Sequence, residues 1–336
     1  MKGLNSKRST ETNKIPYIKI ALCCLVAVLL ICVGFLFLKE WEGNMGLFPE
    51  HEIFDEVIKH DGVEYVLKEN VETFLVLGLD KFEGSSSADS YNNDKQADFL
   101  MLFVFDNDSK QYTAIHINRD TMVDVNVLGV AGNKVDTVYK QIALSHTYGN
   151  GKDLSCHNTS NSVSSLLMGM KVNHYASVTL DTVAIVNDLV GGVRVEILDD
   201  FTGIDDSLVK GETVILKGAQ ALTYVQTRKG LEDSSNSTRM QRQQQYINAL
   251  YEAFNECAKA DDEFIVDVSL KMSDYMISDR SVTQLQALAE KFSEYEFLGI
   301  ESLAGESVLG EEYMEFYPEE EAIKEMIIEL FYMPKT

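Results

Sequence analysis

Two short segments of the chain are apolar at almost every position, Thr73–Leu79 (TFLVLGL) and Phe99–Phe105 (FLMLFVF). Successive side chains of a strand point to opposite faces of a sheet, so strands that are apolar throughout are typically buried on both faces. Further strand signals recur at Tyr112–Ile117, His174–Leu180 and Val193–Ile197. Together these segments predict a central β-sheet that is covered on both sides.

Helical signals alternate with these strands. They comprise Asp181 as an N-cap before TVAIVNDLV, apolar positions at helical spacing in Arg239–Ala258, a helix opened by Asp279 and Ser281 that runs to Phe292, and Pro318 with carboxylates in the first turn of EEEAIKEMIIELF. The alternation predicts an α/β fold, in which a central mixed β-sheet carries helices on both faces as an α-β-α sandwich.

An uncharged segment of nineteen residues, Ile20–Leu38, lies near the N-terminus. As a helix it would span roughly 28 Å, close to the ~30 Å hydrocarbon core of a bilayer. The alternative is a cleavable signal peptide, whose apolar region usually has about 7–15 residues and ends in a small-residue cleavage site. Because this segment is longer and continues into KEWEGNMGLFPE, we interpret it as an uncleaved transmembrane anchor.

Basic residues precede this anchor: Lys2, Lys7, Arg8, Lys14 and Lys19 stand against a single acidic residue, Glu11. Positive charge beside a membrane span stays in the cytoplasm. We therefore predict a single-pass protein of the cell membrane, with a cytoplasmic tail at 1–19, the anchor at 20–38, a stalk at 39–62 and one extracellular domain at 63–333.

The chain is strongly acidic, with a formal net charge of -24. This charge argues against nucleic acid as a partner, because binding a nucleic-acid backbone needs a basic face. Against that background, Tyr224–Gln245 (YVQTRKGLEDSSNSTRMQRQQQ) brings Arg228, Arg239 and Arg242 together in sequence. Guanidinium groups bind phosphate through two parallel hydrogen bonds, so the cluster indicates a bound phosphate.

Each polar motif also has an ordinary structural interpretation when it is taken alone. An aspartate before a strand, such as Asp98, is usually a turn or cap residue. Arg119 and Asp120 would form a surface ion pair, and Arg239 with Arg242 would form the solvated face of a helix. His116, inside a strand, is interpreted as a core or edge residue rather than as a base.

The order of several motifs, however, resembles the LytR-CpsA-Psr family of bacterial envelope enzymes. The motifs are Gly78-Leu79-Asp80, Ala97-Asp98-Phe99, Ile117-Asn118-Arg119-Asp120-Thr121, Gln226-Thr227-Arg228, and Asn236-Ser237-Thr238-Arg239-Met240-Gln241-Arg242-Gln243. The resemblance covers roughly Val66 to Tyr332. No single motif decides it, but their shared order is specific.

The resemblance implies a phosphotransferase that moves a glycopolymer, such as teichoic acid or capsular polysaccharide, from a polyprenyl-pyrophosphate carrier to peptidoglycan. A sugar hydroxyl would attack a phosphorus atom of the pyrophosphate, giving a phosphodiester and releasing polyprenyl phosphate. The alternative is a catalytically weak protein that binds polyprenyl-phosphate-linked glycans and acts as an envelope scaffold or regulator. A third hypothesis is a simple pyrophosphatase.

The resemblance also assigns roles to residues. Asp98, Arg119, Arg228 and Arg239 are the predicted catalytic residues, and the three arginines with Gln226 and Gln243 are predicted to bind the pyrophosphate. Gln243 lies one helical turn after Arg239, so both side chains lie on one helix face. Asp98 and Asp80 are the candidate ligands of a magnesium ion, with Asp98 as the alternative base. The lipid would also need an apolar slot, which no sequence feature locates.

The chain departs from the family pattern at four places. Gln226 and Asn236 replace an arginine and an aspartate, Asn118 replaces a proline, and Gln96-Ala97 replaces Arg-Ser. One hypothesis is that Gln226 and Asn236 pair with each other through their amides. Because cationic groups are lost, we expect the rate of turnover to be lowered more than the affinity for the ligand.

Overall fold

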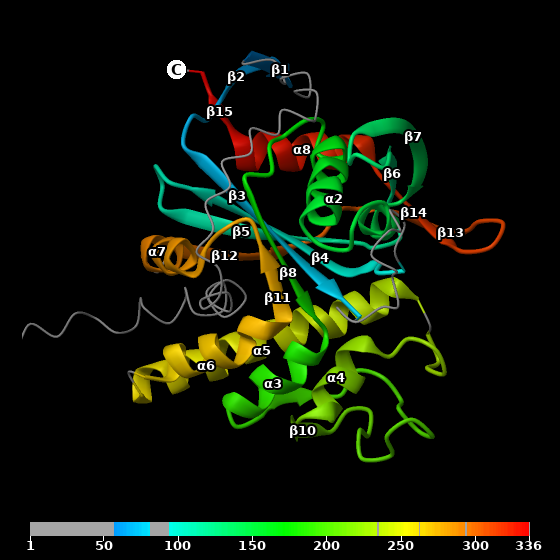
Figure 1. Ribbon diagram of the computed structural model, residues 1–336, viewed down its shortest axis with the longest axis vertical. Helices are drawn as coiled ribbons and strands as arrows, with labels where there is room; N and C mark the ends of the chain where they lie inside the picture. Colours follow the sequence, from blue (N-terminus) through cyan, green and yellow to red (C-terminus); the bar gives the residue numbers. More distant parts are fainter. Residues whose placement is uncertain (1–56, 81–93, 234, 262, 293, 336) are drawn as a thin grey trace, which may run out of the picture.

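A six-stranded mixed sheet forms the centre of the protein (Figure 1). In spatial order its strands are β11 (Met276–Ser278), β8 (His174–Thr179), β3 (Val71–Leu79), β4 (Ala97–Asp106), β5 (Gln111–Ile117) and β12 (Glu296–Glu301). The β3–β8 and β5–β12 pairs are parallel, and the other neighbouring pairs are antiparallel. The computed structural model describes residues 57–80, 94–233, 235–261, 263–292 and 294–335.

Both faces of this sheet are buried, as the two apolar segments predict. Along β3, Phe74 and Val76 belong to one core cluster, while Leu75 and Leu77 belong to another. Figure 1 shows α2 (Asp153–Leu166) and α8 (Glu320–Phe331) on one side of the sheet, and α3, α5 and α6 on the other. The prediction of a mixed α/β fold around a central sheet is confirmed.

The helices lie close to their predicted positions. The remaining ones are α3 (Asp181–Leu189), α4 (Ala219–Gln226), α5 (Asn236–Ala260), α6 (Phe264–Met272) and α7 (Val282–Phe292), with 3-10 turns at η2 (Ile142–Thr147) and η3 (Ser273–Tyr275). Two details were wrong. The N-cap of α3 is Leu180, so Asp181 lies inside the first turn. Pro318 ends a strand instead of opening α8, whose N-cap is Glu319.

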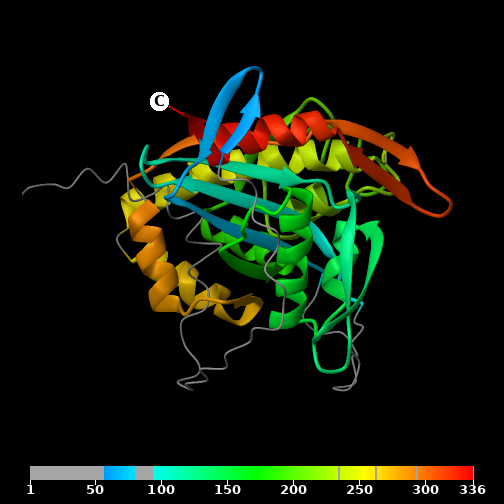
Figure 2. The ribbon, with the colours of Figure 1, turned by 90° about the horizontal axis from the view of Figure 1, so that it is seen from above.

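Three two-stranded sheets extend the fold beyond the prediction. They are β6 (Met122–Leu128) with β7 (Lys134–Gln141), β9 (Val193–Glu196) with β10 (Thr213–Leu216), and β13 (Gly305–Leu309) with β14 (Met314–Pro318). The predicted strand Val193–Ile197 is therefore real, but it pairs with β10 and not with the central sheet. Figure 2 shows the β13–β14 hairpin projecting from one end of the molecule.

The folded part begins earlier than residue 63, which corrects the predicted stalk boundary. β1 (Val57–His60) pairs with β2 (Val63–Leu67), and β2 pairs with β15 (Tyr332–Pro334). The turn between β1 and β2 is Asp61-Gly62, with φ of 49° and 81°. An Asp-Gly pair with two positive φ angles is a favoured two-residue hairpin turn, because it matches the twist of the strands.

The predicted tail and anchor, 1–19 and 20–38, lie outside the described residues, as does most of the stalk. Within the residues that are described, none of the helices combines the length and the apolar character needed to cross a membrane.

Candidate functional site

The central strands bring Asp98 and Arg119 together. Leu100 of β4 pairs with Ile117 of β5, so the start of β4 and the end of β5 lie side by side. Arg119 forms an ion pair with Asp98. Arg239, from the first turns of α5, donates to the Asp98 carbonyl oxygen at 3.3 Å, and its Nη1 lies 4.0 Å from Asp98 Oδ1.

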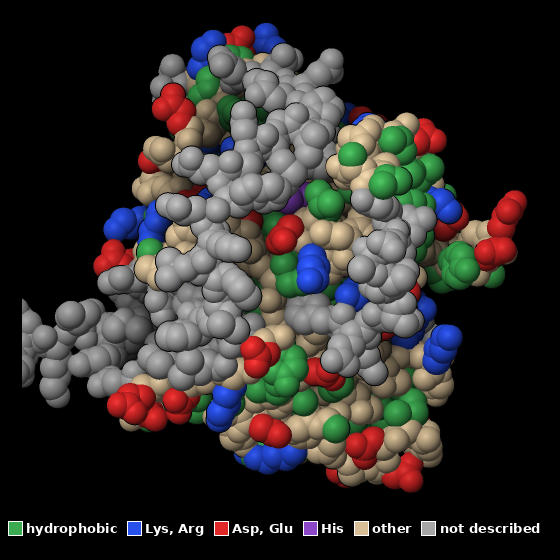
Figure 3. All heavy atoms as spheres, viewed as in Figure 1, with side chains coloured by type: hydrophobic (Ala, Val, Ile, Leu, Met, Phe, Trp, Pro, Cys, Tyr) green, Lys and Arg blue, Asp and Glu red, His purple; other side chains and the backbone are tan. Residues whose placement is uncertain are grey.

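Asp120 links the third arginine to this group. Its Oδ1 lies 3.6 Å from Arg119 Nε, and its Oδ2 lies 3.8 Å from Arg228 Nη1. The structure thus places Arg119, Arg228 and Arg239 around the carboxylates of Asp98 and Asp120. We call these five residues the arginine cluster. On the face shown in Figure 3, Lys and Arg side chains lie next to Asp and Glu side chains near the middle of the molecule.

Arg119, Arg239 and Asp120 are largely buried, whereas the Arg228 side chain is 31% exposed. Burial shifts the pKa values of the buried members. Arg119 and Asp120 have side chains that are 14% and 6% exposed, so the interpretation as a surface ion pair is wrong. Burial lowers the pKa of Arg239 to about 10, and the positive charges of Arg119 and Arg228 add to the effect. Burial also raises the pKa of Asp120, despite the arginines beside it.

Two donors of the arginine cluster are left without hydrogen-bond partners. Among the described residues, no acceptor is within hydrogen-bonding geometry of Arg119 Nε or Arg239 Nε, although both atoms are buried. A buried donor without a partner costs roughly 1–3 kcal/mol of stability. The cluster therefore retains unused capacity to bind an anion, and it holds three cations close together at some cost to folding.

Three of the four unusual amides, Gln96, Asn118 and Asn236, contact the arginine cluster directly. Asn118 Oδ1 accepts from the Asp120 backbone N–H at 2.9 Å, which closes an Asx-type turn where the family pattern has proline. Asn118 also accepts from the amide of Asn236, and Asn236 in turn accepts from Arg239. Gln96 accepts from Arg119.

The predicted pairing of Gln226 with Asn236 is not observed. Gln226 donates to Asp80 Oδ1 at 3.1 Å, whereas Asn236 contacts Asn118 and Arg239. Within the described part of the chain, no hydrogen bond joins the two amides. The reason is positional: Gln226 ends α4 beside the end of β3, and Asn236 opens α5 beside the turn after β5.

Gln243 lies one helical turn after Arg239 on α5. Its amide donates to the Val225 carbonyl oxygen at 3.1 Å and also contacts His116. Burial lowers the pKa of His116 to about 3, with a further contribution from Arg239. The His116 ring packs against Phe99 with 5.0 Å between ring centroids. His116 is therefore neutral at physiological pH, in agreement with its interpretation as a core residue.

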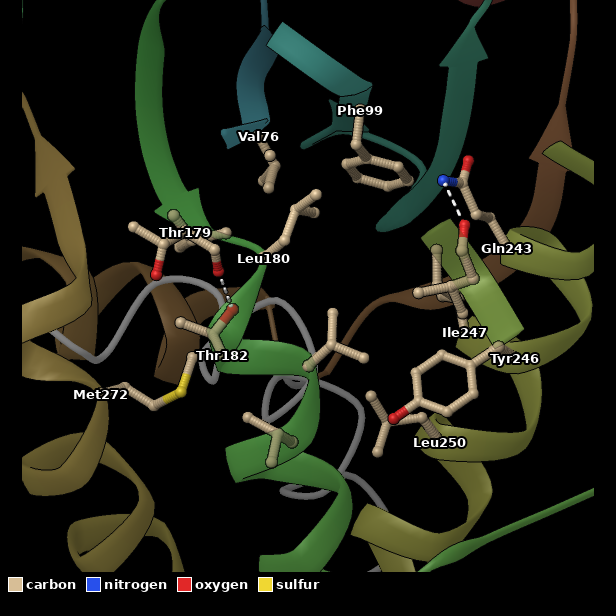
Figure 4. A pocket seen from close by; sticks show the side chains of 15 residues that line it. Val76, Phe99, Thr179, Leu180, Thr182, Gln243, Tyr246, Ile247, Leu250 and Met272 are labelled. Carbon is tan, nitrogen blue, oxygen red and sulfur yellow. Dashed lines mark hydrogen bonds between the residues drawn. The ribbon is translucent and has the colours of Figure 1, made fainter. Parts of the chain in front are cut away.

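An apolar pocket adjoins the arginine cluster between the sheet and helices α3 and α5 (Figure 4). It encloses about 750 Å³, part of it open to solvent, and Val76, Phe99, Leu180, Ile247 and Leu250 are among its lining residues. Gly78 contributes to the space, because a Cβ atom there would lie 2.8 Å from the Cβ of Phe99 on the neighbouring strand. Most of its lining residues are apolar.

Four elements contribute to both the apolar pocket and the charged site beside it. The neighbouring pairs are Gly78 and Asp80 from β3 and its end, Phe99 and Asp98 from β4, Val225 and Gln226 from α4, and Gln243 and Arg239 from α5. The same elements therefore build the apolar pocket and the charged site, and on α5 Gln243 of the pocket lies one turn from Arg239. Such a surface fits a ligand with an apolar tail and an anionic head.

Arg242 contacts a different group of residues from those of the arginine cluster. Its Nε donates to the Tyr224 carbonyl oxygen at 2.9 Å, its Nη2 donates to the Thr227 carbonyl oxygen, and its Nη1 pairs with Asp199. Its guanidinium also lies 5.6 Å from the centroid of the Phe201 ring. Arg242 is fully buried, so its role is structural and the solvated-face interpretation is wrong.

The candidate magnesium ligands can be tested by their chemistry. Asp98 lies in the arginine cluster, and Asp80 is exposed at its edge and accepts from Gln226. The described residues contain no group of three or more His, Cys, Asp or Glu side chains that could hold a metal ion. Magnesium, however, is usually held by one or two carboxylates together with substrate phosphates and water. The two aspartates fit that pattern only when a phosphate ligand is bound.

Sequence reasoning missed several parts of this site. Asp120 was noted only as the neighbour of Arg119, although it contacts two arginines. Asp199, the partner of Arg242, lies in a loop with no helical or strand signal. The apolar pocket was expected but not located, because its lining residues are of the same types as the rest of the core.

A sequence profile described as the LytR_cpsA_psr family matches residues 50–330 of the chain. No curated protein sequence matches the chain. Several solved structures share the fold. TagT bound to LI-WTA is 21% identical, with a TM-score of 0.57 and coverage of 78% of this chain and 90% of that one.

Two further structures show the same likeness. TagV of B. subtilis is 22% identical, with a TM-score of 0.57 and coverage of 79% of this chain and 97% of that one. A protein from Streptococcus agalactiae is 17% identical, with a TM-score of 0.62 and coverage of 78% and 86%. At these identities the likeness establishes a common fold.

Proposed function

The chain belongs to the LytR_cpsA_psr family, and from that premise we propose that it transfers a glycopolymer from a polyprenyl-pyrophosphate carrier to peptidoglycan. The observation that carries the proposal is the arginine cluster at the edge of the apolar pocket. Arg119, Arg228 and Arg239 converge there from three separate parts of the chain. TagT, which shares the fold, has been solved bound to LI-WTA.

The ligand in this proposal has two chemically different ends. Its polyprenyl chain occupies the apolar pocket, whose walls are almost entirely carbon. Its pyrophosphate lies against the arginines, where charge-assisted hydrogen bonds contribute about 1.5–3 kcal/mol each. The free Nε donors of Arg119 and Arg239 supply part of this contact. Gln226, which bonds Asp80, and Gln243, one helical turn after Arg239, complete the proposed binding set.

In the transfer step, an acceptor hydroxyl oxygen of peptidoglycan forms a bond to the phosphorus that carries the glycan. The bond from that phosphorus to the bridging oxygen breaks, so polyprenyl phosphate leaves and a phosphodiester remains. Arg119, Arg228 and Arg239 stabilise negative charge on the phosphoryl oxygens. Asp98, which contacts two of these arginines, is the candidate base that would take the hydroxyl proton.

Magnesium is the proposed cofactor, and Asp98 and Asp80 would hold it. It would supply positive charge that neutralises the pyrophosphate. Asp98 then has two candidate roles, base and metal ligand. If Asp98 is only a ligand, activity of Asp98→Asn should recover at high magnesium concentration. If it is the base, added magnesium should not restore turnover.

The predicted anchor at residues 20–38 is part of the same proposal. A carrier with a polyprenyl chain resides in a membrane, and a single-pass anchor would hold the domain beside it. The positive-inside rule places that domain on the extracellular side, where peptidoglycan is the acceptor.

A second candidate is a binding protein with little turnover, acting as an envelope scaffold or regulator. The observation that favours it is that the arginine cluster is already engaged: Arg119 contacts Asp98 and Gln96, and Arg239 contacts Asn236. A pyrophosphate would have to displace these partners. Binding and turnover must therefore be measured separately.

The test uses the full-length protein in detergent with magnesium, a polyprenyl-pyrophosphate glycan and peptidoglycan. We expect release of polyprenyl phosphate and transfer of the glycan, both suppressed by Arg239→Ala. Arg194→Ala is the matched control, since Arg194 is exposed on β9 and away from the cluster.

Three other results would change the conclusion. Carrier binding without transfer would select the scaffold function. Hydrolysis of the pyrophosphate that is indifferent to peptidoglycan would indicate a pyrophosphatase. Equal turnover in Arg239→Ala and wild type would remove the arginine cluster from the mechanism.

A further inference from the structure

Helix α5 lines two pockets with two different stripes of side chains. Gln243, Tyr246, Ile247 and Leu250 face the apolar pocket, and Ser237, Met240, Gln241 and Gln244 face a second one. Both sets have the spacing i, i+3, i+4, i+7, which places four side chains on one side of a helix. At 3.6 residues per turn the two stripes lie about 120° apart around the helix axis.

The second pocket is polar, and we call it the amide pocket. It is lined by Asn118, Ser237, Gln241, Gln244, Ser302 and Phe316, among others. It encloses about 580 Å³, part of it open to solvent. Gln244 Nε2 donates to Ser302 Oγ at 2.8 Å, so a hydrogen bond joins its two sides.

The lining of the amide pocket is electrically neutral. None of the described Lys, Arg, Asp or Glu side chains lines it, although the chain has a formal net charge of -24. Its one titratable side chain, His116, is buried and has its pKa lowered to about 3, so it is uncharged. In the described part of the chain, His116 Nδ1 has no hydrogen-bond partner although it is buried. A charged ligand would find no counter-ion here.

The amide pocket therefore offers a ligand uncharged hydrogen-bond donors and acceptors next to apolar side chains. Side-chain amides and hydroxyls can both donate and accept. Met240, Leu303 and Phe316 supply carbon surface. A pyranose ring has the same character, since its hydroxyls donate and accept and its C–H faces are apolar. An N-acetyl group adds one more donor, one acceptor and a methyl group.

The amide pocket begins next to the arginine cluster. Asn118, which lines the pocket, directly precedes Arg119 and bonds to the Asp120 backbone. We propose that the amide pocket binds one uncharged sugar, a hexose or N-acetylhexosamine, of a glycan that takes part in the reaction at the arginine cluster. This inference rests on the proposed function for the identity of the glycan, but sugar binding itself can be measured without it.

The first experiment measures sugar binding directly. The full-length protein in detergent is titrated with a neutral N-acetylhexosamine disaccharide and with a glucose disaccharide, observed by saturation-transfer NMR and calorimetry. Wild type is expected to bind at least one of them. The double variant Gln241→Leu/Gln244→Leu should bind at least about tenfold more weakly, because each lost hydrogen bond typically weakens binding several-fold.

The matched control is Gln245→Leu. Gln245 is the next residue on the same helix, but its side chain bonds the Glu196 carbonyl oxygen and Tyr224 Oη instead of facing the amide pocket. Its sugar affinity should equal that of wild type. A second variant, Ser302→Phe, fills the pocket from the opposite side and should also abolish binding. The inference is overturned if wild type binds neither disaccharide, or if the double variant binds as tightly as the control.

Further arms identify the source of the sugar. A short polyprenyl pyrophosphate without sugar should bind wild type and Gln241→Leu/Gln244→Leu equally, which tests the proposed function alone. If the sugar belongs to the donor, the double variant should lose affinity only for the sugar-bearing carrier. If it belongs to the acceptor, the KM for a peptidoglycan fragment should rise while carrier affinity stays unchanged. If wild type binds no carrier, the proposed function fails, and the disaccharide titration still decides the sugar site.

Discussion

Arg239 and Arg242 lie less than one helical turn apart on α5, and both guanidinium groups are buried. Their surroundings differ, because one group is fully hydrogen-bonded and the other is not. Arg242 bonds two backbone carbonyl oxygens and Asp199, and it packs against Phe201. Arg239 contacts Asp98 and Asn236, keeps a buried Nε without a partner among the described residues, and faces two other arginines.

A structural arginine and one available to a ligand differ in how completely their donors are bonded. Burial alone does not distinguish them, because both side chains are buried. What differs is the number of satisfied donors and the sign of the neighbouring charges. A fully satisfied arginine stabilises the fold and has no capacity for a ligand. A crowded and incompletely bonded one destabilises the fold and gains when an anion binds.

The largest expected effect is on folding, from Arg242→Met. The substitution leaves Asp199 buried without its cation and leaves two carbonyl oxygens without their donor. Removing one partner of a buried ion pair costs about 3–5 kcal/mol. Urea unfolding followed by circular dichroism should show this loss as a lower midpoint. The double variant Arg242→Met/Asp199→Leu should recover part of it, and equal losses in both would contradict the pairing.

The next largest effect is on turnover, from Arg239→Met. Loss of one donor to a developing oxyanion typically lowers kcat about 10²–10³-fold, or about 2.7–4 kcal/mol. The unfolding free energy should fall by less than in Arg242→Met, because removal of Arg239 relieves repulsion from Arg119 and Arg228. Turnover and urea unfolding are measured on the same preparation, with Arg194→Met as control. If Arg239→Met lost as much stability as Arg242→Met, both arginines would be structural and the two regions would not differ.

A smaller effect should follow from ligand addition. Inorganic pyrophosphate at a hundred times its Kd stabilises a native state by about 2.7 kcal/mol, and we expect a higher Tm for wild type. The shift should be much smaller for Arg239→Met, since the arginine cluster has lost a cation. It should persist in Arg194→Met. If Arg239→Met shows the full shift, the anion binds elsewhere.

The sequence predicted the central sheet well, because β3 and β4 are apolar on both faces and leave few alternatives. It also predicted that Arg119, Arg228 and Arg239 would meet, but only through the resemblance to a family. Taken alone, an arginine that follows a strand is compatible with a surface ion pair. Nothing local in the sequence reports that Arg119 is buried.

The partners of these residues could not be predicted for a different reason. Gln226 and Asn236 were expected to pair, yet each bonds a residue more than a hundred positions away, Asp80 and Asn118. Such contacts depend on how α4 and α5 pack against the sheet, and spacing within a motif carries no information about that. The Asp61-Gly62 turn is the opposite case, because its signal is local and was simply missed.

A change at Glu72 should have the smallest effect on stability. This carboxylate lies outside both arginine regions but, like Arg242, it has several ionic partners. His174 Nε2 lies 3.3 Å from Glu72 Oε1, and Lys291 also pairs with this carboxylate. Its pKa is lowered from 4.5 to about 2, mainly by the hydrogen bond to His174 and also by Lys291. A depressed pKa means that the native state holds the proton less tightly than the unfolded state.

Glu72 therefore adds stability above pH 4.5 that is lost as the pH falls towards 2. Glu72→Gln should be less stable than wild type at neutral pH, and the two should converge across this window in urea unfolding. Asp120 contributes with the opposite sign, since burial raises its pKa, and its contribution to stability grows as the pH falls. Unfolding free energies that decline in parallel for Glu72→Gln and wild type would show that the contacts of Glu72 with His174 and Lys291 do not stabilise the fold.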